Sequence, residues 1–102
     1  MPTRVEWHPG AFADLEELDP TVRQRVTDAV GRLRFLDDPK QRLLPYVETL
    51  KGYWKLRVGD YRVVCQLKRD AQGQLIVVIN VVHRGEAYRS RSVRTIQRRS
   101  ED

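Results

Sequence analysis

Three basic side chains, Lys55, Arg57 and Arg62, lie on the two sides of a glycine–aspartate pair that favours a tight turn. If the flanking segments pair across that turn, Arg57 faces Arg62 directly and Lys55 lies on the same face. Like charges directly opposite each other in a sheet are destabilising, by up to roughly 1 kcal/mol. Guanidinium groups bind phosphate oxygens through paired hydrogen bonds, so an anion over this face would relieve the repulsion. The pattern therefore predicts a phosphate-binding face; the alternative is the solvated basic face of an outer hairpin.

The elements that must position these side chains form a β-hairpin. Residues 54–58 alternate apolar and basic, and the alternation resumes over residues 61–67, a period typical of half-buried strands. Gly59-Asp60 between them suits a two-residue type II′ turn, because glycine stands first. The face opposite the basic side chains is predicted to lie in the core. Its members are Trp54, Leu56, Val58, Tyr61, Val63 and Cys65.

The composition fits one small globular domain over residues 1–102. Hydrophobic residues make up 40% and charged residues 32%, which allows a single modest core. The net charge of +5 favours an anionic partner such as nucleic acid, a membrane surface or an acidic protein. No apolar run approaches the roughly 20 residues that span a bilayer, and the start of the chain lacks an apolar stretch of signal-peptide length. We therefore expect a cytoplasmic protein without a membrane partner.

One cysteine and two histidines leave little scope for sulfur or metal chemistry. A single cysteine excludes an internal disulfide, and Cys65 falls on the apolar face of a predicted strand, so we expect a small core residue rather than a nucleophile. The histidines and the cysteine lack the spacing of metal ligands. We expect neither a metal nor a cofactor.

The first part of the chain predicts a strand followed by two helices. Residues 3–7 alternate in the manner of a short strand, whereas apolar residues recur at helical spacing over residues 11–18 and 20–36. Asp19 and Pro20 are a typical helix start, with the aspartate as N-cap and the proline in the first turn. The two helices are predicted to pack as a hairpin against a sheet.

The remaining segments complete an α+β fold. Residues 40–49 have no clear period and contain a proline, so we expect a loop. The β-branched run 75–82 predicts a central strand buried on both faces. A short C-terminal helix is expected from about Glu86 onward, with Arg99 in a basic stripe along its outer side, and residues 100–102 are expected to fray. The predicted fold is an antiparallel sheet with the helical hairpin on one face and the other face, which carries the basic side chains, partly open.

Two motifs in these elements resemble those of a known superfamily. Residues 50–64, LKGYWKLRVGDYRVV, are similar to the signature hairpin of RelE/ParE-superfamily toxins, and residues 81–88, VVHRGEAY, resemble its closing motif. The resemblance covers nearly the whole chain. It implies a RelE-like, microbial-RNase-like fold and a toxin of a type II toxin–antitoxin system, with an antitoxin as its protein partner.

The resemblance also implies one of two activities. RelE-type toxins cleave mRNA in the ribosomal A site without a metal: the ribose 2′-hydroxyl attacks the adjacent phosphate and leaves a 2′,3′-cyclic phosphate. ParE-type toxins instead inhibit DNA gyrase. We favour the RelE-type endoribonuclease, with mRNA and the ribosome as partners; a plain RNA-binding module is a third, weaker interpretation. The antitoxin is expected to be acidic where it covers the basic face.

Five residues match the positions that carry catalysis in RelE-type toxins. Arg57 and Arg62 would hold the phosphate as negative charge develops on it. Lys55 would accept the proton of the 2′-hydroxyl, and the neighbouring arginines would favour the neutral amine that a general base requires. Arg84 would support the leaving 5′-oxygen. Tyr88 would stack on or orient a base of the substrate.

Two departures from the family pattern leave the identity of the base open. Tyr53 stands where many RelE-type enzymes carry a further lysine, and Glu48 stands where related branches carry a glutamate base. The base is therefore Lys55 or Glu48, and we favour Lys55. Further RNA contacts are expected from basic residues near the motifs, with a solvated surface as the alternative. They are Lys51, His83, Arg89 and Arg91.

Overall fold

The predicted hairpin is formed by β3 (Trp54–Val58) and β4 (Tyr61–Asp70). Gly59 has a φ of 57°, whereas Asp60 has no positive φ, which is the combination that a type II′ turn requires. This turn matches the right-handed twist of the two strands. The predicted turn is therefore confirmed, and it fixes the register of every side chain along the hairpin.

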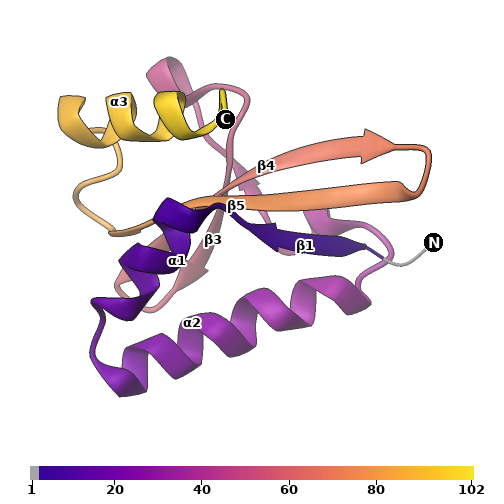
Figure 1. The fold of residues 1–102 in the computed structure, drawn as a ribbon, viewed down its shortest axis with the longest axis horizontal. Coiled ribbons are helices and arrows are strands. Elements are labelled where there is room, and N and C mark those ends of the chain that lie inside the picture. The colour runs from indigo at the N-terminus through magenta and orange to yellow at the C-terminus, as the bar shows by residue number, and fades with distance from the viewer. Residues whose placement is uncertain (1–2) are drawn as a thin grey trace.

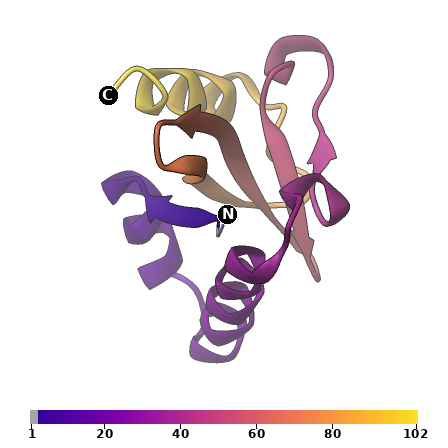
Figure 2. The same cartoon turned by 90° about the vertical axis from the view of Figure 1, so that its right-hand side faces the viewer.

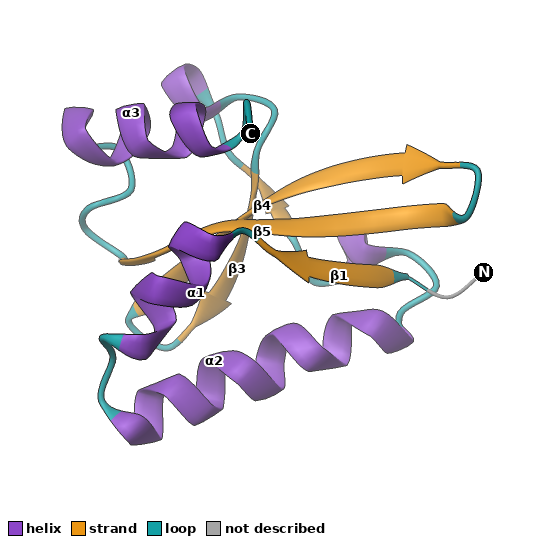
Figure 3. Cartoon of the chain, in the orientation of Figure 1, coloured by secondary structure: helices purple, strands orange, loops and turns teal. Residues whose placement is uncertain are grey.

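A computed structural model describes residues 3–102, and its elements form one sheet with helices on both faces (Figures 1 and 3). The elements other than the hairpin are β1 (Arg4–Trp7), α1 (Pro9–Glu16), α2 (Pro20–Arg32), β2 (Leu44–Pro45), β5 (Gly73–His83) and α3 (Ser90–Arg99). No helix among the described residues combines the length and the apolar character needed to cross a membrane. Within the same residues, histidine, cysteine and carboxylate side chains form no group of three or more that could hold a metal ion.

The sheet is mixed rather than purely antiparallel. Its order is β1-β5-β4-β3-β2, so β4 lies at the centre, and β5, which the β-branched run predicts to be central, is an interior strand between β1 and β4. The pairs β5–β4, β4–β3 and β3–β2 are antiparallel, but β1 pairs with β5 in parallel. The alternation of residues 3–7 predicts the strand correctly; it carries no information about its partner, which lies some 70 positions away along the chain.

The helical hairpin follows its capping residues. His8 caps α1, since its Nδ1 accepts a hydrogen bond from the Gly10 amide at 2.9 Å, and the helix therefore begins two residues earlier than expected. Asp19 caps α2 as predicted, by accepting from the Thr21 amide at 3.0 Å. The helix ends at Arg32 and continues as a short 3-10 helix, Leu33–Phe35.

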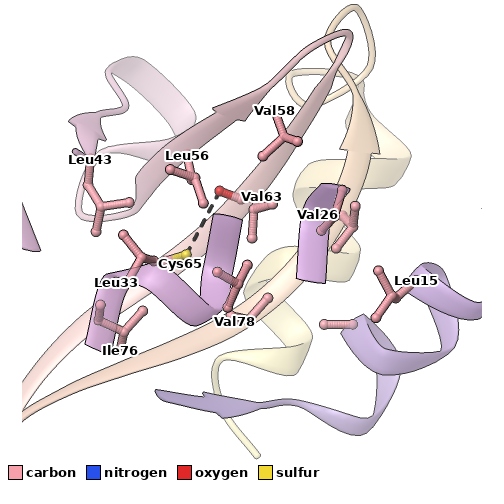
Figure 4. Packing of buried hydrophobic residues seen from close by; sticks show 13 residues of the cluster. Leu15, Val26, Leu33, Leu43, Leu56, Val58, Val63, Cys65, Ile76 and Val78 are labelled. Atoms are coloured by element: carbon pink, nitrogen blue, oxygen red, sulfur yellow. Dashed lines mark hydrogen bonds between the residues drawn. The ribbon is translucent and has the colours of Figure 1, made fainter. Parts of the chain in front are cut away.

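The main core lies between this helical hairpin and the sheet (Figure 4). The predicted core face of β3 and β4 points into it, and Trp54 and Tyr61 pack at its margin. The buried members from the hairpin strands are Leu56, Val58, Val63 and Cys65. Cys65 is fully buried and burial raises its pKa to about 12, which suits a core residue and not a nucleophile.

A second, smaller core lies on the opposite face of the sheet, under α3 (Figures 1 and 2). It covers part of the face that we expected to be open. The helix begins at Ser90 rather than at Glu86, because residues 86–89 form turns that bury Ala87 against the sheet. The buried members of this cluster are Tyr46, Leu50, Val64, Ile79, Ala87 and Ile96.

Candidate functional site

Two of the predicted catalytic arginines meet at the tip of the β3–β4 hairpin. Arg62 donates from Nη1 to the carbonyl oxygens of Gly59 at 2.9 Å and Tyr61 at 2.8 Å. Arg84, which follows β5, donates its backbone N–H to the Asp60 carbonyl at 2.8 Å, and its Nη1 lies 3.7 Å from the Asp60 carboxylate. The Arg62 guanidinium is thus held at the turn by hydrogen bonds and the exposed Arg84 guanidinium lies near its carboxylate, and both keep further donors free for an anion.

Arg57 lies opposite Arg62 in the ladder, as the register predicts. It is exposed and sits beyond the short pairing of β2, so this end of β3 forms an edge of the sheet. Among the described residues no ion pair involves Arg57. The two like charges therefore face each other near the hairpin tip, and no ion pair within residues 3–102 offsets the charge of Arg57.

Lys55 lies half-buried over an aromatic ring that we did not predict to be in the site. Its Nζ is 5.0 Å from the centre of the Tyr46 ring, which is the geometry of a cation–π contact. Tyr46 reaches this place because Leu44 and Pro45 pair with Lys55 and Trp54 as β2. Residues 40–49 are thus not wholly a loop, and their proline is tolerated on a two-residue edge strand.

Tyr88 contacts the other side of the same ring. Its ring meets that of Tyr46 edge-to-face, with centres 5.6 Å apart and an interplanar angle of 80°. The Tyr88 hydroxyl donates to the Val47 carbonyl and accepts from the Val47 amide, both at 3.1 Å. The side chain remains 44% exposed, so one part of it is held in place while the rest is open to a ligand.

Glu48, the alternative base, directly follows the residue that Tyr88 holds. It is exposed and has a φ of 58°, the left-handed conformation that costs a residue other than glycine about 1 kcal/mol. The two candidate bases thus flank the Tyr46–Tyr88 pair, Lys55 over the Tyr46 ring and Glu48 on the segment bound to Tyr88. This geometry accommodates either residue as the base.

The predicted RNA-contact residues are exposed around this group. Lys51 follows the short 3-10 helix Glu48–Leu50. His83 packs edge-to-face on Tyr61, with ring centres 5.6 Å apart, at the end of β5. Arg89 and Arg91 lie at the start of α3. Among the described residues, no hydrogen bond, ion pair or cation–π contact links these four side chains to Lys55 or Arg62, and their role stays a prediction.

Tyr46 is the site residue that sequence reasoning missed. Its hydroxyl is buried and has no hydrogen-bond partner among the described residues. Burial raises its pKa to about 12, the neighbouring Tyr88 adds to the effect, and the charge of Arg62 opposes it. The signal available in the sequence was the apolar Leu43-Leu44 before Pro45, which is typical of an edge strand. The Tyr46 ring contacts Lys55 and Tyr88 and also lies in the electric field of Arg62. It therefore connects Lys55 and Tyr88 with the arginines at the hairpin tip.

We predict that Tyr46→Phe leaves the free energy of unfolding unchanged or raises it by up to about 1 kcal/mol, since it removes a buried hydroxyl that lacks a partner. Tyr46→Leu should lower it by about 2 kcal/mol through loss of the contacts with Lys55 and Tyr88. Urea unfolding of both variants measures the difference. Equal destabilisation by Tyr46→Phe and Tyr46→Leu would show that the Tyr46 hydroxyl has a hydrogen-bond partner.

A second prediction concerns alkaline pH. The pKa values of Cys65 and Tyr46 are raised to about 12 from ordinary values of 9.0 and 10.0, so the folded state holds both protons more tightly than the unfolded chain. Their contribution to stability is complete below about pH 9 and is lost as the pH rises toward 12. Urea unfolding across this range should give a steeper loss for the wild type than for the variant Cys65→Ala with Tyr46→Phe. If the free energy of unfolding fell equally steeply with pH in the wild type and the variant, the raised pKa values of Cys65 and Tyr46 would be contradicted.

Comparisons with known proteins agree with the two sequence motifs. Residues 5–88 match the family described as the ParE toxin of the type II toxin–antitoxin system parDE. The toxin–antitoxin complex RelBE2 from Mycobacterium tuberculosis contains a chain with 26% identity and a TM-score of 0.63; the match covers 82% of this chain and 100% of that one. No curated protein sequence matches.

Two further solved structures show the same fold at lower identity. The archaeal RelE–RelB complex from Pyrococcus horikoshii gives 23% identity and a TM-score of 0.61, covering 85% of this chain and 100% of that one. A mutant of E. coli toxin RelE in the free state gives 20% identity and a TM-score of 0.65, covering 97% and 98%. The RelE-like fold expected from the motifs is confirmed. Since the family match spans most of the chain, this protein belongs to the ParE toxin family of type II toxin–antitoxin systems, within the RelE/ParE superfamily.

Proposed function

We propose that this toxin is a ribosome-dependent mRNA endonuclease of the RelE type. The observation that carries the proposal is the convergence of Arg62 and Arg84 on one turn, next to Arg57 and to the group formed by Lys55 and Tyr88. A phosphoryl-transfer reaction needs fixed positive charge around the reacting phosphate more than any other contribution. The Arg62 guanidinium, which is already hydrogen-bonded to two backbone carbonyls, supplies such charge with little further ordering.

The proposed reaction uses the substrate's own ribose as nucleophile. The 2′-hydroxyl oxygen attacks the adjacent phosphorus, and Lys55 as neutral amine, or Glu48 as carboxylate, accepts its proton. Arg57 and Arg62 stabilise the added charge on the phosphate oxygens. The bond to the 5′-oxygen breaks with electrostatic support from Arg84, and the departing oxygen takes a proton from water or from the protonated base, which leaves a 2′,3′-cyclic phosphate and a 5′-hydroxyl. This mechanism requires no metal ion.

Tyr88 is proposed to orient the substrate base through its exposed ring. Its hydroxyl is engaged with both polar groups of Val47, so the ring plane is fixed before a substrate arrives. Pre-ordered aromatic rings are a usual platform for unpaired bases. The cognate antitoxin, which the similarity to toxin–antitoxin complexes supports, is proposed to be acidic where it covers Lys55, Arg57 and Arg62.

A second candidate function is inhibition of DNA gyrase, and the description of the matching family as ParE toxins favours it. Induction of the gene in bacteria distinguishes the two functions. The endonuclease predicts an immediate arrest of translation with cut transcripts and no DNA-damage response. A gyrase inhibitor instead predicts an SOS response and filamentation with intact transcripts, and that result would replace the proposal.

A further inference from the structure

A second basic surface lies between α2 and the end of β3. It lines a hollow of about 360 Å³, which we call the arginine hollow. On α2 its residues recur at positions i, i+3, i+4 and i+7, which places them on one helix face. The charged side chains that line it are Arg25, Asp28, Arg32, Arg42 and Arg57. Of these, only Arg57 belongs to the catalytic group proposed above.

The positive charge of the arginine hollow is only partly neutralised by the protein, because four arginines line it with one carboxylate. Within residues 3–102, none of its four arginines takes part in an ion pair. The single carboxylate there, that of Asp28, accepts a hydrogen bond from Gln24 Nε2 at 2.8 Å instead. The four guanidinium groups around this hollow repel one another. A bound anion would attract all of them and offset this repulsion.

The hollow adjoins the hairpin tip that holds Arg62 and Arg84. Gly59 lines it, and a Cβ atom added to Gly59 would lie 3.2 Å from Arg25 Nη2. The absence of a side chain at Gly59 thus lets the Arg25 guanidinium approach the turn. The carbonyl of the same residue accepts the hydrogen bond from Arg62. An extended polyanion that places one phosphate at Arg57 and Arg62 therefore reaches the hollow with a neighbouring one.

An exposed aromatic ring stands next to the hollow. A second, more apolar hollow of about 450 Å³ shares Ala29, Arg32 and Arg42 with the first and is lined by Phe35, which is 80% exposed. A positively charged groove combined with an aromatic ring on which a base can stack is the usual arrangement for binding single-stranded nucleic acid. An acidic peptide would use the charge equally well, but the connection to the hairpin tip favours RNA.

We infer that the arginine hollow binds a backbone phosphate of the RNA substrate beside the scissile one, with the attached base on Phe35. This inference rests on the proposed function and adds a subsite to it. The volume of the arginine hollow, about 360 Å³, suits a phosphate with its sugar, since ligand pockets start at about 300 Å³. The guanidinium fork matches two phosphate oxygens, so Arg32 and Arg42 supply charge and geometry together.

The test is the salt dependence of RNA binding. Fluorescence anisotropy measures the affinity of a labelled 2′-O-methyl RNA, which lacks the nucleophile and cannot be cleaved. Arg32→Ala with Arg42→Ala should weaken binding about tenfold and reduce the slope of log affinity against log salt by about 1.4, because each lost contact to a single strand contributes about 0.7. Phe35→Ala should weaken binding about fivefold and leave the slope unchanged.

The matched control is Arg69→Ala with Arg98→Ala, which removes the same charge at exposed positions outside the hollow. An unchanged slope in the hollow variant, or an equal change in the control, would overturn the inference. So would unchanged RNA affinity together with lost binding of a glutamate- and leucine-rich helical peptide, which would assign the hollow to a protein partner. Because the readout is binding of an uncleavable RNA, failure of the proposed cleavage and failure of the subsite are seen separately.

Discussion

Arg62→Ala combined with Arg84→Ala is expected to abolish toxicity and to lower the rate of mRNA cleavage at least about 10³-fold. The two guanidinium groups are the fixed charges at the hairpin tip that would stabilise the pentacovalent phosphate and the leaving oxygen. Loss of one such donor typically costs a factor of about 10² to 10³ in other enzymes. Cleavage in a translation extract, quantified by primer extension, measures the effect.

Stability must be controlled in this variant, because Arg62 also supports the turn through its bonds to Gly59 and Tyr61. Their loss should cost about 1 kcal/mol, which leaves the domain folded. Circular dichroism and urea unfolding verify this. The control Arg69→Ala with Arg98→Ala should keep full activity. A folded double variant that remains toxic would refute the proposed mechanism.

Asp14→Ala is expected to lower the free energy of unfolding by about 3 kcal/mol, the largest stability effect that we predict for a single side chain. The Asp14 carboxylate accepts from Arg99 Nη1 at 2.8 Å and from the Val81 amide at 3.1 Å. Arg99 Nη1 also donates to the Ile79 carbonyl and to Asn80 Oδ1. The pair is largely buried, with side chains 16% and 23% exposed, so removal of the carboxylate leaves a poorly solvated charge.

The comparison for Asp14→Ala is Asp70→Ala, which breaks the exposed pair between Arg4 and Asp70. Those side chains are 33% and 49% exposed, and a surface pair contributes less than about 1 kcal/mol. Urea unfolding should therefore separate the two variants clearly. Similar losses in both would mean that the Asp14–Arg99 network adds nothing beyond a surface ion pair.

This network explains why the end of the chain differs from the sequence-based expectation. Arg99 was expected to belong to a basic outer stripe on the last helix, but it joins α3 to α1 and β5. A Cβ atom at Gly10 would collide with this guanidinium, so a larger residue there would displace Arg99 from the network. The final residues, expected to fray, are tied by Tyr53–Ser100 and His8–Asp102 hydrogen bonds. All of these partners are distant in sequence, and local periodicity does not encode them.

Features determined by neighbouring residues were predictable. The alternation around Gly59-Asp60 specified the hairpin, its turn and the Arg57–Arg62 pairing. Asp19 likewise specified the start of α2. By contrast, the parallel position of β1 depends on pairing with residues far along the chain, for which the sequence offered no local signal. The short strand β2 had only a weak one, the two leucines before Pro45.

In the candidate site, too, the residues within local motifs were predictable and those brought in by the fold were not. Of the residues that the motifs indicate, Arg62 and Arg84 lie at the Gly59-Asp60 turn, and Lys55 and Tyr88 contact the Tyr46 ring; their catalytic roles stay predictions. Tyr46 was missed because Pro45 argued against regular structure in residues 40–49, so the strand β2 that positions Tyr46 was not expected. The arginine hollow was missed because the arginines of α2 looked like an ordinary solvated helix face, and only the fold brings them beside Arg57.

The most direct measurement of the central claim is primer extension on a reporter mRNA translated in vitro, with and without the purified toxin, at matched ribosome stalling. The account predicts cuts at codon-spaced positions that disappear when ribosomes are omitted, with 2′,3′-cyclic phosphate ends. A folded toxin that produces no cuts under these conditions would contradict it, and the basic hairpin tip would then be a surface for binding a protein target such as gyrase.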